Sequence, residues 1–78
     1  MLEVQVCYAP PSIQTLIALR LPVGATLYSA ILVSKISVIH PQINLVQQRV
    51  GVFGRIRPLN SVLESGDRVE IYRSLIVD

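Results

Sequence analysis

The chain has 78 residues, of which 51% are hydrophobic and 15% are charged. That length is enough for one domain, and the high aliphatic content excludes a disordered chain. Seven Lys and Arg against five Asp and Glu leave a net charge of +2. This surplus is too small to favour nucleic acid as a partner by itself. We therefore expect residues 1–78 to form a single domain.

The cysteine content and the N-terminal sequence predict a cytoplasmic location. Cys7 is the single cysteine of the sequence, so the chain cannot form an internal disulfide, which fits a reducing compartment. The N-terminus lacks the basic region of a secretory signal peptide. No apolar run approaches the ~20 residues of a membrane-spanning helix. We expect no membrane insertion.

Two alternating stretches, residues 2–8 and 14–21, predict the first two strands. One face of these strands carries Leu2, Val4, Val6 and Tyr8, and then Thr15, Ile17, Leu19 and Leu21. Prolines at 10 and 11 end the first stretch, so the pair is predicted to be a β-hairpin. Leu16 lies on the outer face, which indicates some exposed apolar surface.

A helix is predicted to follow, with Thr26 as its N-cap. Its buried stripe is Leu27, Ala30 and Ile31, and the same spacing continues through Ser34 to Val38. The opposite face carries Tyr28, Ser29, Leu32 and Lys35, and it has few charges for a solvent-facing surface. The helix is expected to fade after Ser34 and to end at His40-Pro41.

Three further strands are predicted in the second half of the chain. Residues 50–54 form the third strand, with glycines that permit a bulge or a close approach, and residues 55–59 form a short fourth strand at an edge. Residues 60–67 are a loop anchored by Val62 and Leu63. In residues 68–73, Val69 and Ile71 face one way, and Arg68, Glu70 and Tyr72 face the other. This last strand is expected to lie centrally.

This order of elements predicts an α+β fold of the β-grasp (ubiquitin-like) type. The sheet would be mixed, with four to five strands, and one crossover helix would cover one face. The first and last strands would lie side by side and parallel.

The chain resembles the RnfH family of small bacterial ubiquitin-like proteins. The similar segments are residues 4–8, 22–26, 50–55, Leu59, 62–63 and 66–73. The resemblance implies a β-grasp fold, and the family is named for a neighbourhood with the Rnf electron-transport complex. It also implies an antitoxin-like, RatB-type role as the partner of a START-like toxin called RatA. It implies no catalytic residues.

The sequence departs from the family pattern in three places. Ser74 stands where a proline commonly follows the final Tyr-Arg. Tyr28 and Leu32 stand on the outer helix face where members tend to carry acids. The sequence stops at Asp78, whereas members often continue into a charged tail. These departures leave the fold prediction intact but affect any partner that binds the helix face or the tail.

No catalytic, cofactor or metal site is predicted. Cys7 and His40 are the only thiol and imidazole, and nothing in their spacing brings them together for nucleophilic catalysis. One Cys, one His and scattered acids do not supply three or four metal ligands. Residues 50–54 lack the spacing and the following helix of a phosphate-binding loop. The final residues contain no Gly-Gly, so a sulfur-carrier role is disfavoured.

Two binding functions remain, and both use the sheet surface. Arginines beside Phe53 and Tyr72 could bind single-stranded RNA by stacking and phosphate contacts; they are Arg49, Arg55, Arg57, Arg68 and Arg73. The preferred prediction is protein binding, because Arg and Tyr often anchor interfaces. Its candidate residues are Arg55, Arg57, Arg68, Glu70, Tyr72 and Arg73, on a face that also exposes Leu16 and Ala18. A homodimer remains open.

Overall fold

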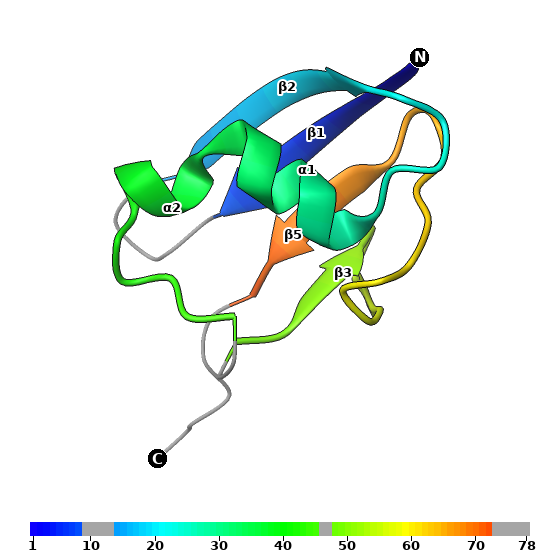
Figure 1. The fold of residues 1–78 in the computed structure, drawn as a ribbon. Helices are drawn as coiled ribbons and strands as arrows, with labels where there is room; N and C mark the ends of the chain where they lie inside the picture. Colours follow the sequence, from blue (N-terminus) through cyan, green and yellow to red (C-terminus); the bar gives the residue numbers. More distant parts are fainter. Residues whose placement is uncertain (9–13, 46–47, 73–78) are drawn as a thin grey trace.

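The computed structural model describes residues 1–8, 14–45 and 48–72. A long hairpin comes first, formed by β1 (Leu2–Tyr8) and β2 (Thr15–Leu21). Two helices follow, α1 (Leu27–Ser34) and α2 (Ile36–Ile39). Three shorter strands complete the chain: β3 (Val50–Val52), β4 (Arg55–Ile56) and β5 (Arg68–Ile71). Figure 1 shows the two helices lying across one side of the sheet.

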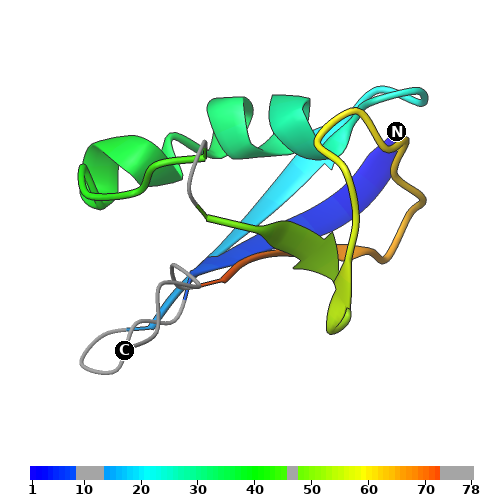
Figure 2. The ribbon, with the colours of Figure 1, turned by 90° about the horizontal axis from the view of Figure 1, so that it is seen from below.

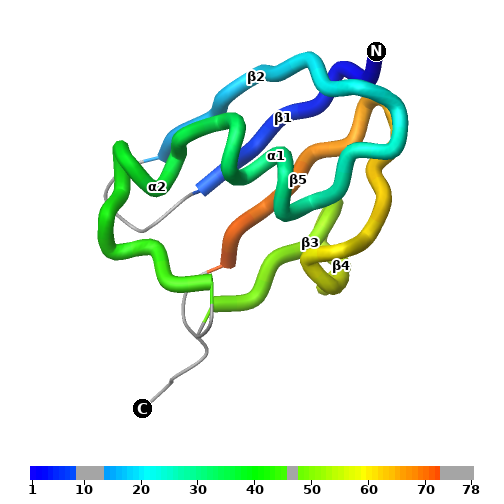
Figure 3. Tube along the Cα trace, in the orientation of Figure 1, coloured from blue at the N-terminus to red at the C-terminus, as the bar shows by residue number. Residues whose placement is uncertain are grey.

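The five strands form one mixed sheet in the order β2-β1-β5-β3-β4, so β5 is central as predicted. β5 is parallel to β1, with Val6 beside Val69 and Tyr8 beside Ile71, and antiparallel to β3. Figure 3 shows how the trace passes from β2 through the helices before it returns to this central position. The parallel pair joined through a helical crossover is the β-grasp arrangement, which confirms the predicted α+β fold.

The alternation of the strands builds the core between sheet and helices. Leu2, Val4, Val6 and Tyr8 are all buried on β1, and the intervening residues are not. From the helix side, Leu27, Ala30 and Ile31 meet them, each at most 1% exposed. Seen from below in Figure 2, both helices lie on one side of the sheet. The other side of the sheet is left without a helical cover within the described residues.

The helix begins where the sequence predicts and ends in an unpredicted way. The Thr26 Oγ1 accepts a hydrogen bond from the Ser29 amide (3.2 Å), and the Thr26 amide donates to the Ser29 Oγ (2.9 Å). Such a reciprocal capping box fixes the start of the helix. Lys35 then adopts a left-handed conformation (φ 58°) that ends α1, and α2 starts directly after it.

This break changes which residues are buried, and it divides the predicted crossover helix into two at the point where the sequence predicts that the helix fades. A continuous helix would place Val38 on the buried stripe, but Val38 is 73% exposed. Ile36 takes the buried position instead, at 0% exposure. The left-handed residue rotates the following turn, so the 3.6-residue period does not continue through it.

Other details also differ from the predictions. β3 ends at Val52, because Phe53 and Gly54 both have positive φ (50° and 82°) and form the turn into β4. The Val62 side chain is 56% exposed, so of the two expected side-chain anchors Leu63 is the buried one; the Leu63 amide donates to the Ala25 carbonyl (2.8 Å). The described part of the last strand ends at Ile71 rather than at residue 73.

His40 is a structural residue at the end of α2. The residue is 6% exposed, and its ring packs edge-on against Tyr8, with ring centroids 4.9 Å apart. His40 Nε2 and Thr15 Oγ1 lie 2.7 Å apart and share a hydrogen bond. These contacts tie the end of the helical segment to the start of β2.

The conformation of Lys35 gives a stability prediction. Lys35→Gly should raise the free energy of unfolding by about 0.5 kcal/mol, because glycine adopts positive φ without the steric cost that other residues incur, and this gain exceeds its extra unfolded-state entropy. Urea unfolding measures the change. Ser37→Gly, two residues later inside α2, is the control and should lower stability. A loss of stability in Lys35→Gly as large as in the control would contradict the assigned helix break.

Candidate functional site

The surface of the sheet opposite the helices, called here the open face, is the candidate site. Because directly paired residues share a face, the strand registers define its members. They are Glu3, Gln5 and Cys7 on β1, Leu16, Ala18 and Arg20 on β2, Gly51 on β3, Ile56 on β4, and Arg68, Glu70 and then Tyr72 on and after β5. Figure 2 shows the β3–β4 turn reaching below the sheet on this side.

At the centre of the open face, the Glu70 carboxylate holds two elements together. Its Oε1 accepts hydrogen bonds from the Gly54 amide (2.7 Å) and from the Tyr72 hydroxyl (2.7 Å). The first bond fixes the β3–β4 turn to β5, and the second fixes the tyrosine ring. Charge-assisted bonds of this kind are stronger than neutral ones, so they hold the turn and the tyrosine in defined positions.

Gly51 provides the space for this arrangement. It lies opposite Glu70 on β3, and a Cβ at this position would be 2.9 Å from the Tyr72 hydroxyl oxygen. The same Cβ would overlap with the carbonyl oxygen of Arg55. The sequence predicted a close approach at these glycines, and the structure confirms it at Gly51.

The surroundings of Tyr72 make its hydroxyl a weaker acid than that of an ordinary tyrosine. Burial, and then the hydrogen bond to Glu70 and the negative charge of that carboxylate, raises the pKa of Tyr72 to about 12 from the ordinary value of 10.0. The hydroxyl therefore stays protonated and remains a donor to Glu70 throughout the neutral range.

Phe53 and Arg68 form the second ordered pair of the open face. The Arg68 guanidinium carbon lies 6.0 Å from the centroid of the Phe53 ring, and Arg68 Nε donates to Gln5 Oε1 (3.3 Å). Phe53 is 59% exposed and Ile56, two residues after the turn, is 55% exposed. An aromatic ring, an arginine and an aliphatic side chain thus lie around the turn that Glu70 holds.

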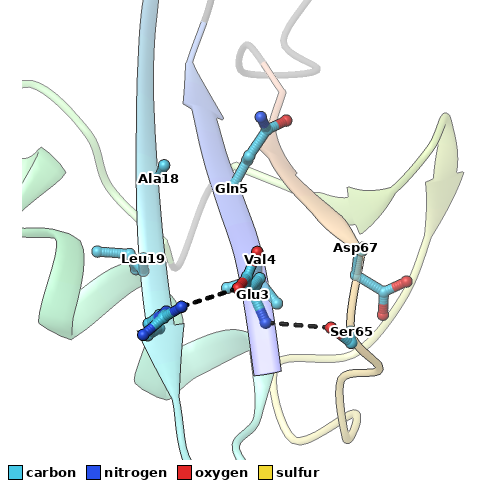
Figure 4. A pocket seen from close by; sticks show the side chains of 9 residues that line it. Glu3, Val4, Gln5, Ala18, Leu19, Ser65 and Asp67 are labelled. Carbon is cyan, nitrogen blue, oxygen red and sulfur yellow. Dashed lines mark hydrogen bonds and ion pairs between the residues drawn. The ribbon is translucent and has the colours of Figure 1, made fainter. Parts of the chain in front are cut away.

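A shallow hollow of about 650 Å³ continues the open face toward the start of β1 (Figure 4). Its walls are β2, β1 and the loop at residues 65–67. An Arg20–Glu3 ion pair of 3.1 Å crosses it, and the Glu3 amide donates to Ser65 Oγ (3.2 Å). Both charged side chains of the pair are well exposed, so the pair contributes little to stability.

The structure separates the predicted partner-binding residues into groups. Arg68, Glu70 and Tyr72 lie on the open face, where Arg68 is exposed and the other two are half-buried. Arg55 pairs with Val52, whose side chain faces the core, so Arg55 points to the helix side of the sheet edge. Arg57 shares that side and donates to the Val62 carbonyl (3.2 Å). Arg73 lies outside the described residues.

The candidate nucleophile and base are placed on opposite sides of the sheet. Cys7 is on the open face beside Leu16 and Glu70, whereas His40 packs against Tyr8 on the core side. Over the described ranges, no three His, Cys, Asp or Glu side chains gather in a way that could hold a metal ion. None of the helices in these ranges is long and apolar enough to cross a membrane.

Sequence reasoning did not assign Gly54 and Ile56 to the candidate site, and it considered Phe53 for RNA stacking alone. The available signal was the pair Phe53-Gly54 between two short β-stretches, since an X-Gly pair there is typical of a two-residue hairpin turn. Reading residues 50–54 as a continuous strand concealed that turn. The acceptor for the Gly54 amide could not be inferred, because it depends on the register between β3 and β5.

A tyrosine titration tests the Glu70–Tyr72 contact. Between pH 10 and about 12 the folded chain keeps the Tyr72 proton and the unfolded chain loses it, so stability should fall as pH rises through this window. Tyr72→Phe should remove the phenolate absorbance component with a midpoint near pH 12. At pH 7 it should cost about 1 kcal/mol through the lost hydrogen bond. Tyr28→Phe is the control and should keep the component with a midpoint near pH 12. If Tyr28→Phe removed that component and Tyr72→Phe did not, the assignment would be refuted.

The close approach at Gly51 gives a second test. Gly51→Ala should lower the free energy of unfolding by about 1–3 kcal/mol, because the added methyl group displaces backbone as well as the Tyr72 hydroxyl. The Tyr72 titration should also shift toward its ordinary value. Urea unfolding and the same phenolate absorbance measure both effects. A variant with unchanged stability and an unchanged titration would show that β4 does not pack against Gly51.

Comparison with known proteins places this arrangement in a family. Residues 2–78 match the family described as RnfH family Ubiquitin. "Protein RnfH" of Paraburkholderia phymatum is 56% identical over 99% of this chain and 70% of the relative, and that of Halorhodospira halophila is 47% identical over 99% and 79%. A "UPF0125 protein" of Chromobacterium violaceum is 44% identical over 99% and 77%. The chain therefore belongs to the RnfH family of ubiquitin-like proteins.

Proposed function

We propose that this chain is a non-enzymatic protein-interaction module that binds another protein through its open face. The observation that supports this most is the ordered group around Glu70. One carboxylate fixes both the β3–β4 turn and Tyr72, and the turn carries an exposed Phe53 beside Arg68. Aromatic and arginine side chains held in fixed positions are typical anchors of protein interfaces.

The composition of the open face supports a protein partner over RNA. Glu3 pairs with Arg20, and Glu70 lies two residues from Arg68 on β5, so both signs of charge occur along the surface. A surface for single-stranded RNA combines a basic groove with free aromatic faces. Here the guanidinium of Arg68 already lies over the Phe53 ring, which competes with base stacking.

The resemblance to the RnfH family suggests two candidate partners. One is a START-like toxin, for which the chain would act as an antitoxin-like partner, and the other is a component of a redox complex. The mechanism we propose is occlusion: the preformed surface docks on the partner and covers the part that the partner needs for its own contacts. We expect the encounter to occur in the cytoplasm. Arg55 and Arg57, on the helix side of the sheet edge, would add charge at the rim.

Direct binding tests the proposal. The purified chain is titrated with the START-like protein and, separately, with redox-complex components encoded in the same genome, and the dissociation constant is measured by calorimetry. Arg68→Glu should weaken binding by about tenfold or more, because it reverses a charge and leaves Phe53 without its cation. Leu32→Ala, at 55% exposure on α1, is the matched control and should bind like the parent chain.

Three results would count against the proposal. If the chain bound neither candidate class, both proposed partners would be ruled out. Loss of binding in Leu32→Ala with normal binding in Arg68→Glu would move the interface to the helix layer. Binding of single-stranded RNA that weakens steeply with salt would favour the RNA alternative.

A further inference from the structure

Among the described residues, β2 has no neighbouring strand on its outer side, and the open-face proposal does not use this edge. β2 stands at one end of the strand order and is seven residues long, whereas β4 at the opposite end has two residues. In Figures 1 and 3, β2 forms the border of the sheet beyond β1. A strand edge exposes backbone donors and acceptors that can pair with another strand.

The strand register identifies which backbone groups face that edge. The Gly66 amide donates to the Glu3 carbonyl (2.7 Å) and the Gln5 amide donates to the Asp67 carbonyl (3.1 Å), so these odd-numbered residues of β1 point toward β5. The even-numbered residues of β1 therefore point toward β2, where Val4 faces Leu19. Within β2 this leaves the amides and carbonyls of Leu16, Ala18 and Arg20 directed outward.

The edge lacks the features that usually prevent pairing. The segment Thr15–Leu21 contains no proline and no lysine. Its one charged residue, Arg20, is engaged with Glu3. Leu16 is 50% exposed, and Ile17 and Leu19 are half-buried at the rim of the core. Natural sheets normally protect an edge of this length with charge, proline or a bulge.

We propose that β2 pairs with β2 of a second copy of this chain, antiparallel across a two-fold axis that passes between the two Ala18 residues. Ala18 is the midpoint of Thr15–Leu21, so all seven residues of each strand overlap in this register. The outward groups then match: Ala18 exchanges two hydrogen bonds with its own copy, and Leu16 does so with Arg20 of the copy. The two five-stranded sheets become one continuous sheet.

The side chains favour a second copy in this register. On the open face the arginines do not meet, because Arg20 lies opposite Leu16 of the copy, where its aliphatic part can pack. On the helix side the half-buried Ile17 lies opposite Leu19 of the copy, which covers both. A register centred on Arg20 would set two arginines opposite each other, and the other nearby registers pair fewer residues.

Oligomeric state and its response to charge at Ala18 test the proposal with the full chain. Light scattering coupled to size-exclusion chromatography should show a mass that rises with concentration to twice 8.6 kDa. Ala18→Lys should raise the dimer dissociation constant by about tenfold or more, because it sets two like charges opposite each other. Gln5→Lys adds the same charge beside Ala18 but one strand inward, and should still dimerise.

A mixing experiment tests the register itself. Ala18→Lys and Ala18→Glu chains should each be monomeric at concentrations where an equimolar mixture forms a dimer, since opposite charges then meet across the axis. A parent chain that stays monomeric at every concentration, or a mixture that fails to recover the dimer, would overturn the proposal. So would a dimer that resists Ala18→Lys and is dissolved by Leu32→Asp on α1. None of these outcomes depends on binding of another protein to the open face.

Discussion

The parallel pairing of β1 with β5 is the contact on which the rest of the structure depends. The two strands are separated by almost the whole chain, yet Val6 and Val69 lie side by side and both have 0% exposure. This pairing requires the crossover that carries the helices onto one side of the sheet. It also places Glu70 at the centre of the opposite side, next to the β3–β4 turn.

The open face follows from that asymmetry. A sheet covered on one side must present the alternate residues of every strand on the other. Most of these residues in β1 and β2 are polar or small, as on an ordinary solvated surface. The exception lies around β5, where one carboxylate orders a turn and a tyrosine, and where Phe53 and Ile56 are exposed beside that turn. This difference within a single surface is the reason for assigning recognition to it.

Much of the fold could be predicted from periodicity, because strands and helices impose different spacings on apolar residues. The alternation in residues 2–8, 14–21 and 68–73 and the cap at Thr26 were sufficient for the hairpin, the central strand and the helix start. The break at Lys35 could not be predicted, since a lysine carries no signal for a left-handed conformation. Less of the candidate site could be predicted from the sequence, for a similar reason. The sequence gives no means of telling Arg55, Arg57 and Arg68 apart, because all three are arginines in predicted strands. Strand register puts the first two on the helix side and the third on the open face.

The most direct measurement of the central claim is a map of backbone amide resonances as the proposed START-like partner is added to the isotope-labelled chain. The account predicts that the perturbed amides cluster at Gly54, Arg68 and Glu70 and their neighbours on the open face. Perturbation centred on α1 and α2 instead, or no perturbation at any amide, would contradict it.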